Sequence, residues 1–310
     1  MADLSFLTPP GEIADWRMTV LFDAVAGAGV LDRLPGSAAD LAGSTGLDAH
    51  GLRVVLDALA AWGVVARDVD GRYVAGPEAP EADDAAVIRH HARAVRRWTT
   101  TLDARLRGEP EAQRVGMVEP AVFADALSVT ARAAAPGLVD RCLDRFPGTR
   151  SVLDLGGLHG EYSLEFARRG LAVTMQDLPP MIEVARARGR LEAAGVELFE
   201  GSFFDAVPEG PFDLAFCCGI THTFDGDRNR ALFANLRPVV PAGGGVAVVT
   251  FLRGRKPLAD VFAVQMLVNG NGGDSHTEEE YRDWLGAAGF RVDGDPLDVP
   301  DRPQSVLFAT

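Results

Sequence analysis

A glycine-rich turn near the middle of the 310-residue chain has the residue types that can hold a nucleotide-like ligand. It reads Asp154-Leu-Gly-Gly-Leu-His-Gly160 and follows an apolar run that starts at Val152. Glycines directly after a strand let a ligand approach the backbone closely. The dinucleotide pattern Gly-x-Gly-x-x-Gly is not met, because Leu158 stands where that pattern needs glycine. The observed pattern is Asp-x-Gly-Gly-x-x-Gly.

A carboxylate downstream gives this turn a more specific meaning. Asp177 closes a second apolar run, Val173–Gln176, and follows the turn at the spacing of about twenty residues that suits hydrogen bonds to a ribose diol. Together, the turn and Asp177 predict a binding site for a ribose-bearing cofactor.

His222 is the first candidate for acid–base chemistry, in the segment Gly219-Ile-Thr-His-Thr-Phe-Asp225. A neutral imidazole can accept a proton near neutral pH, so this histidine can act as a general base. The alternative is a histidine that only makes hydrogen bonds at the end of a strand.

His276 is a second histidine in a later loop, in the segment Gly272-Gly-Asp-Ser-His-Thr277. Two histidines from different loops of one cleft predict a bound metal ion, for which Asp225 is a candidate third ligand. In the alternative interpretation, His276 caps the helix that follows and Asp225 belongs to a solvated helix start.

The elements that must position these residues alternate from residue 151 onward. Apolar strand-like runs are separated by helical patterns, which predicts an α/β domain with a doubly wound parallel sheet. The runs are Val152–Leu155, Val173–Gln176, Phe212–Cys217, Gly245–Phe251 and Ser305–Phe308. Before them, helical patterns cover about 85–107 and 120–145. This part of the chain contains His90, His91, Arg93, Trp98 and Phe123.

The N-terminal region has the order helix, helix, hairpin that is typical of a winged helix. Helical periodicity covers 12–34 with Ile13 as its first apolar position, and Ser37 is a candidate N-cap for the next helix. The remaining elements are a helix over 48–61 and strands Val64–Arg67 and Arg72–Ala75. The second helix carries only one arginine, Arg53, whereas a DNA-recognition helix needs several phosphate contacts. Dimerisation is therefore favoured over DNA binding, with domains expected at 1–95, including a linker, and 96–310.

Composition excludes several classes of function. The net charge of −14 and the pI near 4.9 disfavour a nucleic-acid partner. Three cysteines form no disulfide or zinc pattern, and the N-terminus lacks the features of a signal peptide. No apolar run is judged long enough to span a membrane. We expect a cytoplasmic protein with a small-molecule substrate and no membrane partner.

The order of the motifs resembles that of the small-molecule O-methyltransferases, of the plant caffeate type and their actinobacterial relatives. The shared order is a winged-helix domain, DLGGLHG, QDLPPMIEVA, GSFFDAVP and the His222 segment. This resemblance implies a Rossmann-like seven-stranded methyltransferase sheet, preceded by a winged-helix dimerisation domain, in a homodimer of natural-product metabolism. It also implies S-adenosylmethionine (SAM) as the cofactor and His222 as the general base. A pocket for the methyl acceptor is implied between the helical segment 85–130 and the sheet, with His90, His91, Arg93, Trp98 and Phe123 as its candidate residues. The residues assigned to SAM are Asp154, Gly156, Gly157, Glu161, Asp177, Leu178, Ser202, Phe203 and Cys218, of which Ser202 stands where the family usually has Asp.

The sequence departs from this family around His222. The family supports its histidine with three carboxylates, and the corresponding places here are Thr223, Thr250 and the segment 272–277. One interpretation is the metal-dependent 2-oxo-acid C-methyltransferase branch, in which a divalent or iron ion on His222 and His276 stabilises an enolate. Methylation of carbon or oxygen therefore stays open. The alternative is a SAM-binding protein of this fold that catalyses a hydroxylation, a decarboxylation or a pericyclic step.

Overall fold

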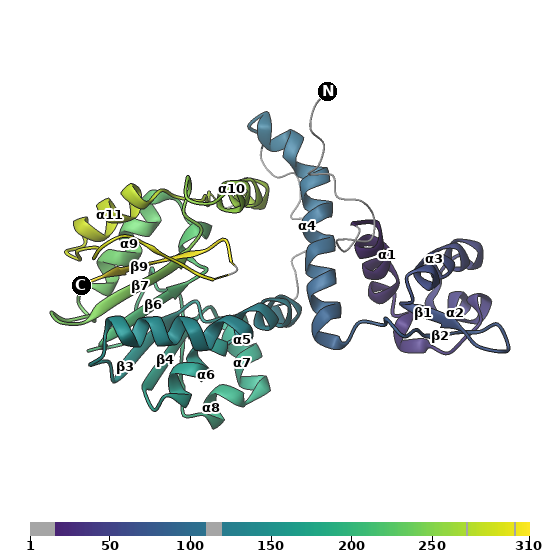
Figure 1. Ribbon diagram of the computed structural model, residues 1–310, viewed down its shortest axis with the longest axis horizontal. Helices are drawn as coiled ribbons and strands as arrows, with labels where there is room; N and C mark the ends of the chain where they lie inside the picture. The colour runs from purple at the N-terminus through teal and green to yellow at the C-terminus, as the bar shows by residue number, and fades with distance from the viewer. Residues whose placement is uncertain (1–15, 110–119, 271, 301) are drawn as a thin grey trace. The chain divides into compact units, whose positions relative to one another are not determined.

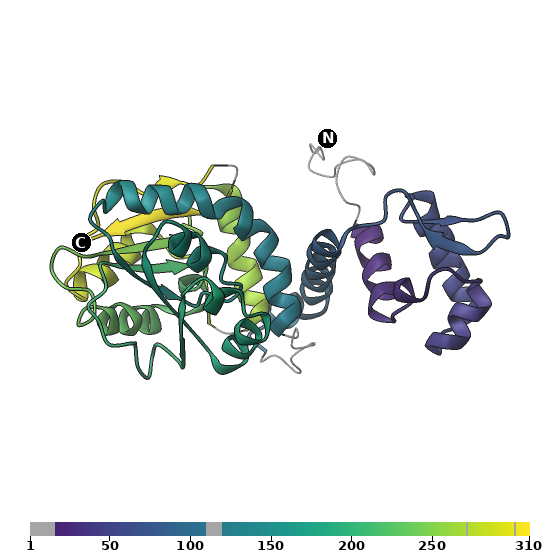
Figure 2. The same ribbon diagram turned by 90° about the horizontal axis from the view of Figure 1, so that it is seen from below.

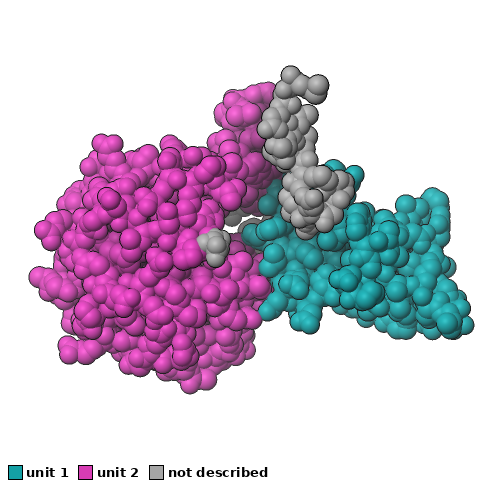
Figure 3. All heavy atoms as spheres, in the orientation of Figure 1, with its two compact units in different colours: residues 1–96 teal, residues 97–310 magenta. Residues whose placement is uncertain are grey.

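The computed structural model describes residues 16–109, 120–270, 272–300 and 302–310. The chain divides into two compact units, residues 1–96 and 97–310, which Figure 3 shows in teal and magenta. The division falls inside a long helix, α4 (Ala82–Leu106). Each unit is described by itself.

The N-terminal unit contains the helix, helix, hairpin order that the sequence predicts. Helices α2 (Ala38–Thr45) and α3 (Ala49–Ala61) precede an antiparallel hairpin of β1 (Val65–Arg67) and β2 (Tyr73–Ala75). Ser37 caps α2 as expected, because its hydroxyl accepts a hydrogen bond of 3.1 Å from the amide of Asp40. The dimerisation role of this unit stays a prediction.

The first helix ends earlier than the sequence suggests. A single helix was expected over 12–34, but α1 spans Trp16–Gly27 and a separate 3-10 turn, η1, covers Leu31–Arg33. The chain turns at Gly29, whose φ of +69° is a left-handed conformation that a continuous helix does not contain. Ile13 lies outside the described residues.

The C-terminal unit is built on a seven-stranded sheet in the order β5-β4-β3-β6-β7-β9-β8 (Figure 1). Strands β3 to β7 pair in parallel, whereas β9 runs antiparallel to both β7 and β8. This confirms the predicted seven-stranded sheet. The strands are β3 (Ser151–Leu155), β4 (Ala172–Asp177), β5 (Glu197–Glu200), β6 (Leu214–Cys218), β7 (Gly245–Thr250), β8 (Leu297–Asp298) and β9 (Ser305–Ala309).

Apolar side chains cover both faces of this sheet, since neighbouring residues of a strand point to opposite sides. On β3, Val152 packs in one core cluster and Leu153 in the other. Helices α5 to α8 cover the first face, and α9 and α11 cover the second (Figure 1 and Figure 2). These helices are α5 (Pro120–Arg145), α6 (Glu161–Arg168), α7 (Pro179–Arg188), α8 (Arg190–Ala193), α9 (Gly226–Leu236) and α11 (Glu278–Ala287), and α10 is Pro257–Asn269.

Helix α5 corrects the expectation that no apolar run reaches the length of a membrane span. By length and composition alone, residues 121–145 qualify as one. The same helix packs Leu138, Val139 and Cys142 into the core against the sheet, which is how a core helix of a water-soluble domain behaves.

Candidate active site

The glycine-rich turn after β3 is required by close packing. Gly156 has a φ of +65°, and its amide donates a 2.8 Å hydrogen bond to the carbonyl of Gln176 on β4. A Cβ atom at Gly157 would lie 2.4 Å from Cγ of Met175, closer than any side chain allows. The glycines therefore let the turn pack closely against Met175 and Ile220 at the carboxyl end of the sheet, where ligands of such folds bind.

Asp177 at the end of β4 holds this turn in place. Its carboxylate accepts a 2.8 Å hydrogen bond from the amide of Leu158 and a 2.7 Å bond from the amide of Leu178. Leu158 needs this support, since its φ of +42° is unusual for a residue with a side chain. Burial raises the pKa of Asp177, although the two amide bonds oppose that shift. Each carboxylate oxygen retains acceptor capacity, so Asp177 can brace the turn and bind a ribose diol together.

Asp154 and Glu161 lie behind the turn and are both buried. Asp154 accepts a 2.5 Å hydrogen bond from the hydroxyl of Ser163, and burial raises the pKa of its carboxyl to about 7. Glu161 begins α6 and binds the guanidinium of Arg190 at 2.9 and 3.3 Å. In this arrangement Asp154 ties β3 to α6, and Glu161 ties α6 to Arg190.

The loop that carries Ser202 and Phe203 is fastened by a residue that the sequence analysis missed. The side-chain amide nitrogen of Gln176, Nε2, donates hydrogen bonds to the carbonyl of Gly201 at 3.3 Å and to that of Ala206 at 2.7 Å. Gln176 is fully buried, and its side-chain oxygen has no hydrogen-bond partner. A polar residue inside an otherwise apolar strand run was the signal that could have identified it.

Leu178 and Cys218 border the turn from neighbouring strands. Leu178 is half exposed directly after β4, and Cys218 ends β6. Burial raises the pKa of the Cys218 thiol to about 12, and its hydrogen bond with the Tyr162 hydroxyl moderates that shift. Cys218 is therefore a neutral thiol and not a nucleophile.

His222 lies in the 3-10 turn η2 (Thr221–Thr223) that follows β6. The imidazole is 6% exposed and meets the rings of Phe251 and Phe262 edge-on, at centroid distances of 5.3 and 4.8 Å. Its Nδ1 is buried without a hydrogen-bond partner. Burial, followed by the charge of His276, lowers the pKa of His222 to about 3, so the ring is neutral at neutral pH.

The three places where the family has carboxylates offer no anion to His222. Thr223 donates its hydroxyl to the carbonyl of Ile220 at 2.6 Å. The hydroxyl of Thr250 lies 3.2 Å from that of Tyr281, which donates to the hydroxyl of Thr221 at 2.7 Å. In the third place, Asp274 forms an ion pair with Arg253, and its amide donates to the carbonyl of His222 at 3.0 Å. These residues hold the backbone around His222 in place, and none of them places an unpaired carboxylate beside its imidazole.

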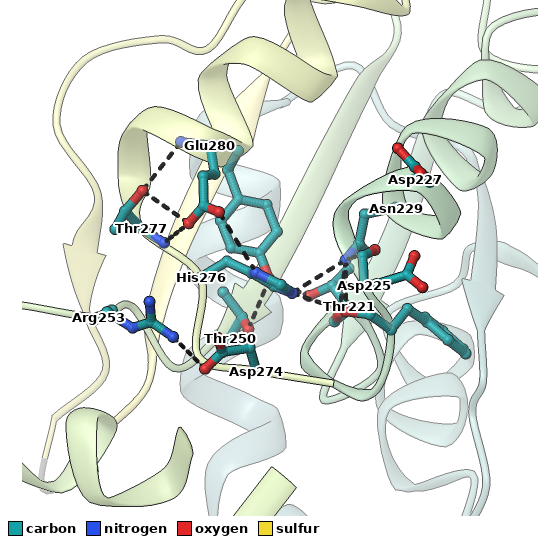
Figure 4. A network of polar contacts seen from close by, with 12 residues as sticks. Thr221, Asp225, Asp227, Asn229, Thr250, Arg253, Asp274, His276, Thr277 and Glu280 are labelled. Carbon is teal, nitrogen blue, oxygen red and sulfur yellow. Dashed lines mark hydrogen bonds and ion pairs between the residues drawn. The ribbon is translucent and has the colours of Figure 1, made fainter. Parts of the chain in front are cut away.

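His276 is engaged with the same loop through its own ring (Figure 4). Its Nε2 lies 2.8 Å from the carbonyl oxygen of Phe224 and 3.5 Å from the side-chain nitrogen of Asn229. The carbonyl only accepts, so Nε2 carries the hydrogen there. The suggestion that His276 caps α11 is wrong, because Thr277 is the N-cap in a capping box with Glu280.

The predicted metal ligands are engaged in contacts within the protein. The Nε2 of His276 donates its hydrogen to the carbonyl of Phe224, so only Nδ1, which lies 3.9 Å from the carboxylate of Glu280, keeps a lone pair for a metal ion. Asp225 caps α9, since its carboxylate accepts a 2.9 Å hydrogen bond from the amide of Arg228. Among the described residues, no group of three His, Cys, Asp or Glu side chains is arranged for metal binding.

Phe262 of helix α10 contacts the ring of His222. Polar residues of α10 form hydrogen bonds with side chains in the C-terminal half of α4. The indole of Trp98 donates to the side-chain oxygen of Gln265 at 2.6 Å, and the guanidinium of Arg97 donates to that of Asn269 at 2.6 Å. Of the acceptor-pocket candidates, Trp98 therefore lies against the helix that contacts His222. The candidates His90, His91 and Arg93 belong to the N-terminal unit.

Known proteins share both the sequence pattern and the fold. Acetylserotonin O-methyltransferase of Gallus gallus is 35% identical over 148 residues, which cover 45% of this chain and 42% of that protein. The 3-amino-4-hydroxybenzoate 4-O-methyltransferase of Streptomyces cremeus is 32% identical over 155 residues, covering 48% and 42%. The matched segments thus span less than half the length of these curated relatives.

Solved structures match over nearly the whole chain. The mitomycin 7-O-methyltransferase superposes with a TM-score of 0.76 at 22% identity, covering 94% of this chain and 93% of that one. Human N-acetylserotonin methyltransferase, solved with SAM, gives 0.72 at 20% identity, covering 99% and 98%. These likenesses establish the fold. The model of the O-methyltransferase domain family matches residues 111–291, more than half of the sequence. The chain therefore belongs to the family of class I SAM-dependent O-methyltransferases.

Proposed function

We propose that this protein transfers the methyl group of SAM to an oxygen of a small molecule in natural-product metabolism. The observation that carries the proposal is the closely packed glycine turn held by Asp177 at the carboxyl end of the sheet, with acceptor capacity left on the carboxylate. The Streptomyces cremeus relative and the mitomycin enzyme are both named as O-methyltransferases of small molecules. Their names support an acceptor oxygen on a specialised metabolite. The proposal includes no metal, since no group of three His, Cys, Asp or Glu side chains is arranged to hold one within the described part of the chain. A homodimer through the N-terminal unit, inferred from the winged-helix pattern, belongs to the same proposal.

The residues have distinct parts in this reaction. Asp177 and the turn at Gly156 hold the cofactor, and the loop fastened by Gln176 borders its base. His222 contacts the acceptor oxygen next to the sulfonium methyl group. The oxygen forms a bond to the methyl carbon as the carbon–sulfur bond breaks, and the electron pair of that bond stays on sulfur. Orientation of the two reactants supplies a large part of the rate, up to about 7–11 kcal/mol in the best cases.

Binding of the cofactor is the first test. At a concentration of SAM, or of its demethylated product S-adenosylhomocysteine, about 100 times the dissociation constant, the folded state should gain about 2.7 kcal/mol. Differential scanning fluorimetry measures this gain as a rise in melting temperature, with ATP as the matched nucleoside control. An unchanged melting temperature with both ligands at saturation would refute the proposed function.

A further inference from the structure

We propose that the acceptor binds as an anion, an acidic hydroxyl or enol that is already ionised near neutral pH, and that His222 donates a hydrogen bond to it instead of removing its proton. Acceptors of this class include hydroxyquinones and enolised dicarbonyl compounds. The inference rests on the proposed function, since it specifies the acceptor of that same site.

The first argument concerns the tautomer of His222. A histidine that acts as a base through Nε2 needs its hydrogen on Nδ1, and a hydrogen-bond acceptor at Nδ1 fixes that tautomer. Here Nδ1 is buried and has no partner. A buried N–H without an acceptor costs free energy, so the hydrogen belongs on Nε2. Nε2 is then a donor, and a donor stabilises an anionic oxygen.

The second argument concerns the hydrogen-bond partners around the ring. On the η2 side, Thr221 and Thr223 carry hydroxyls that are committed to Tyr281 and to the carbonyl of Ile220. On the β7 side, Thr250 also faces Tyr281. On α9, the side-chain nitrogen of Asn229, Nδ2, donates hydrogen bonds to the carbonyls of Thr221, Phe224 and Asp225. The side-chain oxygen of Asn229 has no hydrogen-bond partner, and neither has the Nδ1 of His222. None of these groups can stabilise a positive charge on His222 as a carboxylate would.

The charged groups of the surrounding elements are committed elsewhere. Asp225 caps α9, Asp274 pairs with Arg253, and Glu280 closes the capping box of α11. The interaction with His276 also lowers the pKa of His222, so it opposes a positive charge there.

Helix α10 carries an arginine of α4 hydrogen-bonded to one of its faces. Phe262, Gln265 and Asn269 are three and four residues apart and so share one face of the helix. Asn269 on that face accepts a hydrogen bond from Arg97. Arg97 of α4 thus brings a positive charge to the face of α10 that also carries Phe262, the residue that contacts His222.

The magnitudes favour the same conclusion. A phenol titrates near pH 10, and burial lowers the pKa of His222 to about 3. Before the acceptor binds, proton transfer from a phenol to this ring would be unfavourable by a factor of about 10⁷, the difference between these two values. An acceptor that has lost its proton to solvent avoids this step. Its oxygen then forms the bond to the methyl carbon, the carbon–sulfur bond breaks toward sulfur, and the negative charge and the sulfonium charge cancel.

The experiment compares two acceptors with the same ring system. The full-length protein and SAM are incubated with 2-hydroxy-1,4-naphthoquinone, an acidic hydroxyl, or with 2-naphthol, a plain one, and S-adenosylhomocysteine is measured by liquid chromatography. We expect kcat/KM at pH 7 to be at least about 100-fold higher for the hydroxynaphthoquinone. With 2-naphthol the rate should rise about tenfold per pH unit between pH 7 and 9, as the anion fraction rises. With the hydroxynaphthoquinone it should be flat.

Three variants test the part of His222. His222→Gln keeps a side-chain donor without a base and should retain kcat/KM for the hydroxynaphthoquinone within about tenfold, whereas His222→Ala should lose more. Thr223→Asp places a carboxylate beside the half-buried end of η2 and should increase the rate with 2-naphthol. His50→Gln, an exposed histidine of the N-terminal unit, is the matched control.

The outcomes separate the two proposals. Loss of activity by about 10²–10⁴-fold in His222→Gln, the range expected for a removed base, would overturn the anion proposal, as would equal use of the two acceptors. Either result leaves the proposed function intact as long as SAM raises the melting temperature. A chain that SAM does not stabilise refutes the proposed function itself.

Discussion

Asp177→Asn should weaken the cofactor site in a way that the structure allows to be estimated. Each oxygen of the carboxylate accepts one hydrogen bond from a backbone amide, one from Leu158 and the other from Leu178. Asparagine keeps one acceptor and turns an NH₂ group toward the other amide. A hydrogen bond to a charged group contributes about 1.5–3 kcal/mol, so the loss of one predicts a destabilisation of this size. In a domain of this length, that corresponds to a fall in melting temperature of about 3–12 °C.

The affinity for SAM should fall by a further amount, since the same carboxylate is proposed to bind the ribose. The loss of about 1.5–3 kcal/mol there corresponds to a dissociation constant about 10–100 times higher. Thermal unfolding without ligand measures the first effect, and isothermal titration calorimetry with SAM measures the second. Asp205→Asn is the control, because Asp205 is an exposed carboxylate on the neighbouring loop. A variant with the melting temperature and SAM affinity of the unaltered protein would refute the account of Asp177.

Two further predictions concern stability. Burial raises the pKa of Asp154 in the folded state to about 7, so this group's contribution is complete below about pH 4 and is lost as the pH rises toward 7. Urea unfolding should show the free energy of unfolding falling by up to about 1.4 kcal/mol per pH unit in that window, and Asp154→Asn should remove this part of the slope; an unchanged slope would contradict the assignment. Thr277→Ala removes the N-cap of α11 and should cost about 0.5–2 kcal/mol in the same assay, with Thr130→Ala, an exposed threonine of α5, as the control; equal effects of the two changes would contradict the capping role.

Local patterns predicted the cofactor side of the site well, because the residues involved are close in sequence or follow strands. The glycine turn comes directly after the apolar run of β3, and Asp177 directly after that of β4, so parallel pairing alone brings them together. The long central strands gave clear apolar runs for the same reason, since both of their faces are buried.

Other elements could not be predicted, because their signals are short or non-local. Strand β8 has two residues, both exposed, and β5 has an exposed residue at each end, so neither forms an apolar run. The role of Gln176 depends on carbonyls 25 and 30 residues away. The bond between His276 and Phe224 joins loops 52 residues apart, which is why two histidines in one cleft were interpreted as metal ligands.

The loss of the three carboxylates is a property of the whole cluster around His222. Thr221, Thr250 and Tyr281 are fully buried and satisfy one another's hydroxyls, so a carboxylate placed at position 250 would be a buried charge without a cation beside it. The chain has thus replaced a charged support by a neutral one that packs as part of the core. A support of this kind fixes where His222 lies and leaves its basicity low. If the acceptor binds as an anion, as we propose, such a site needs an acceptor that brings its own negative charge, and the acceptor's acidity is the property to screen first, before its shape.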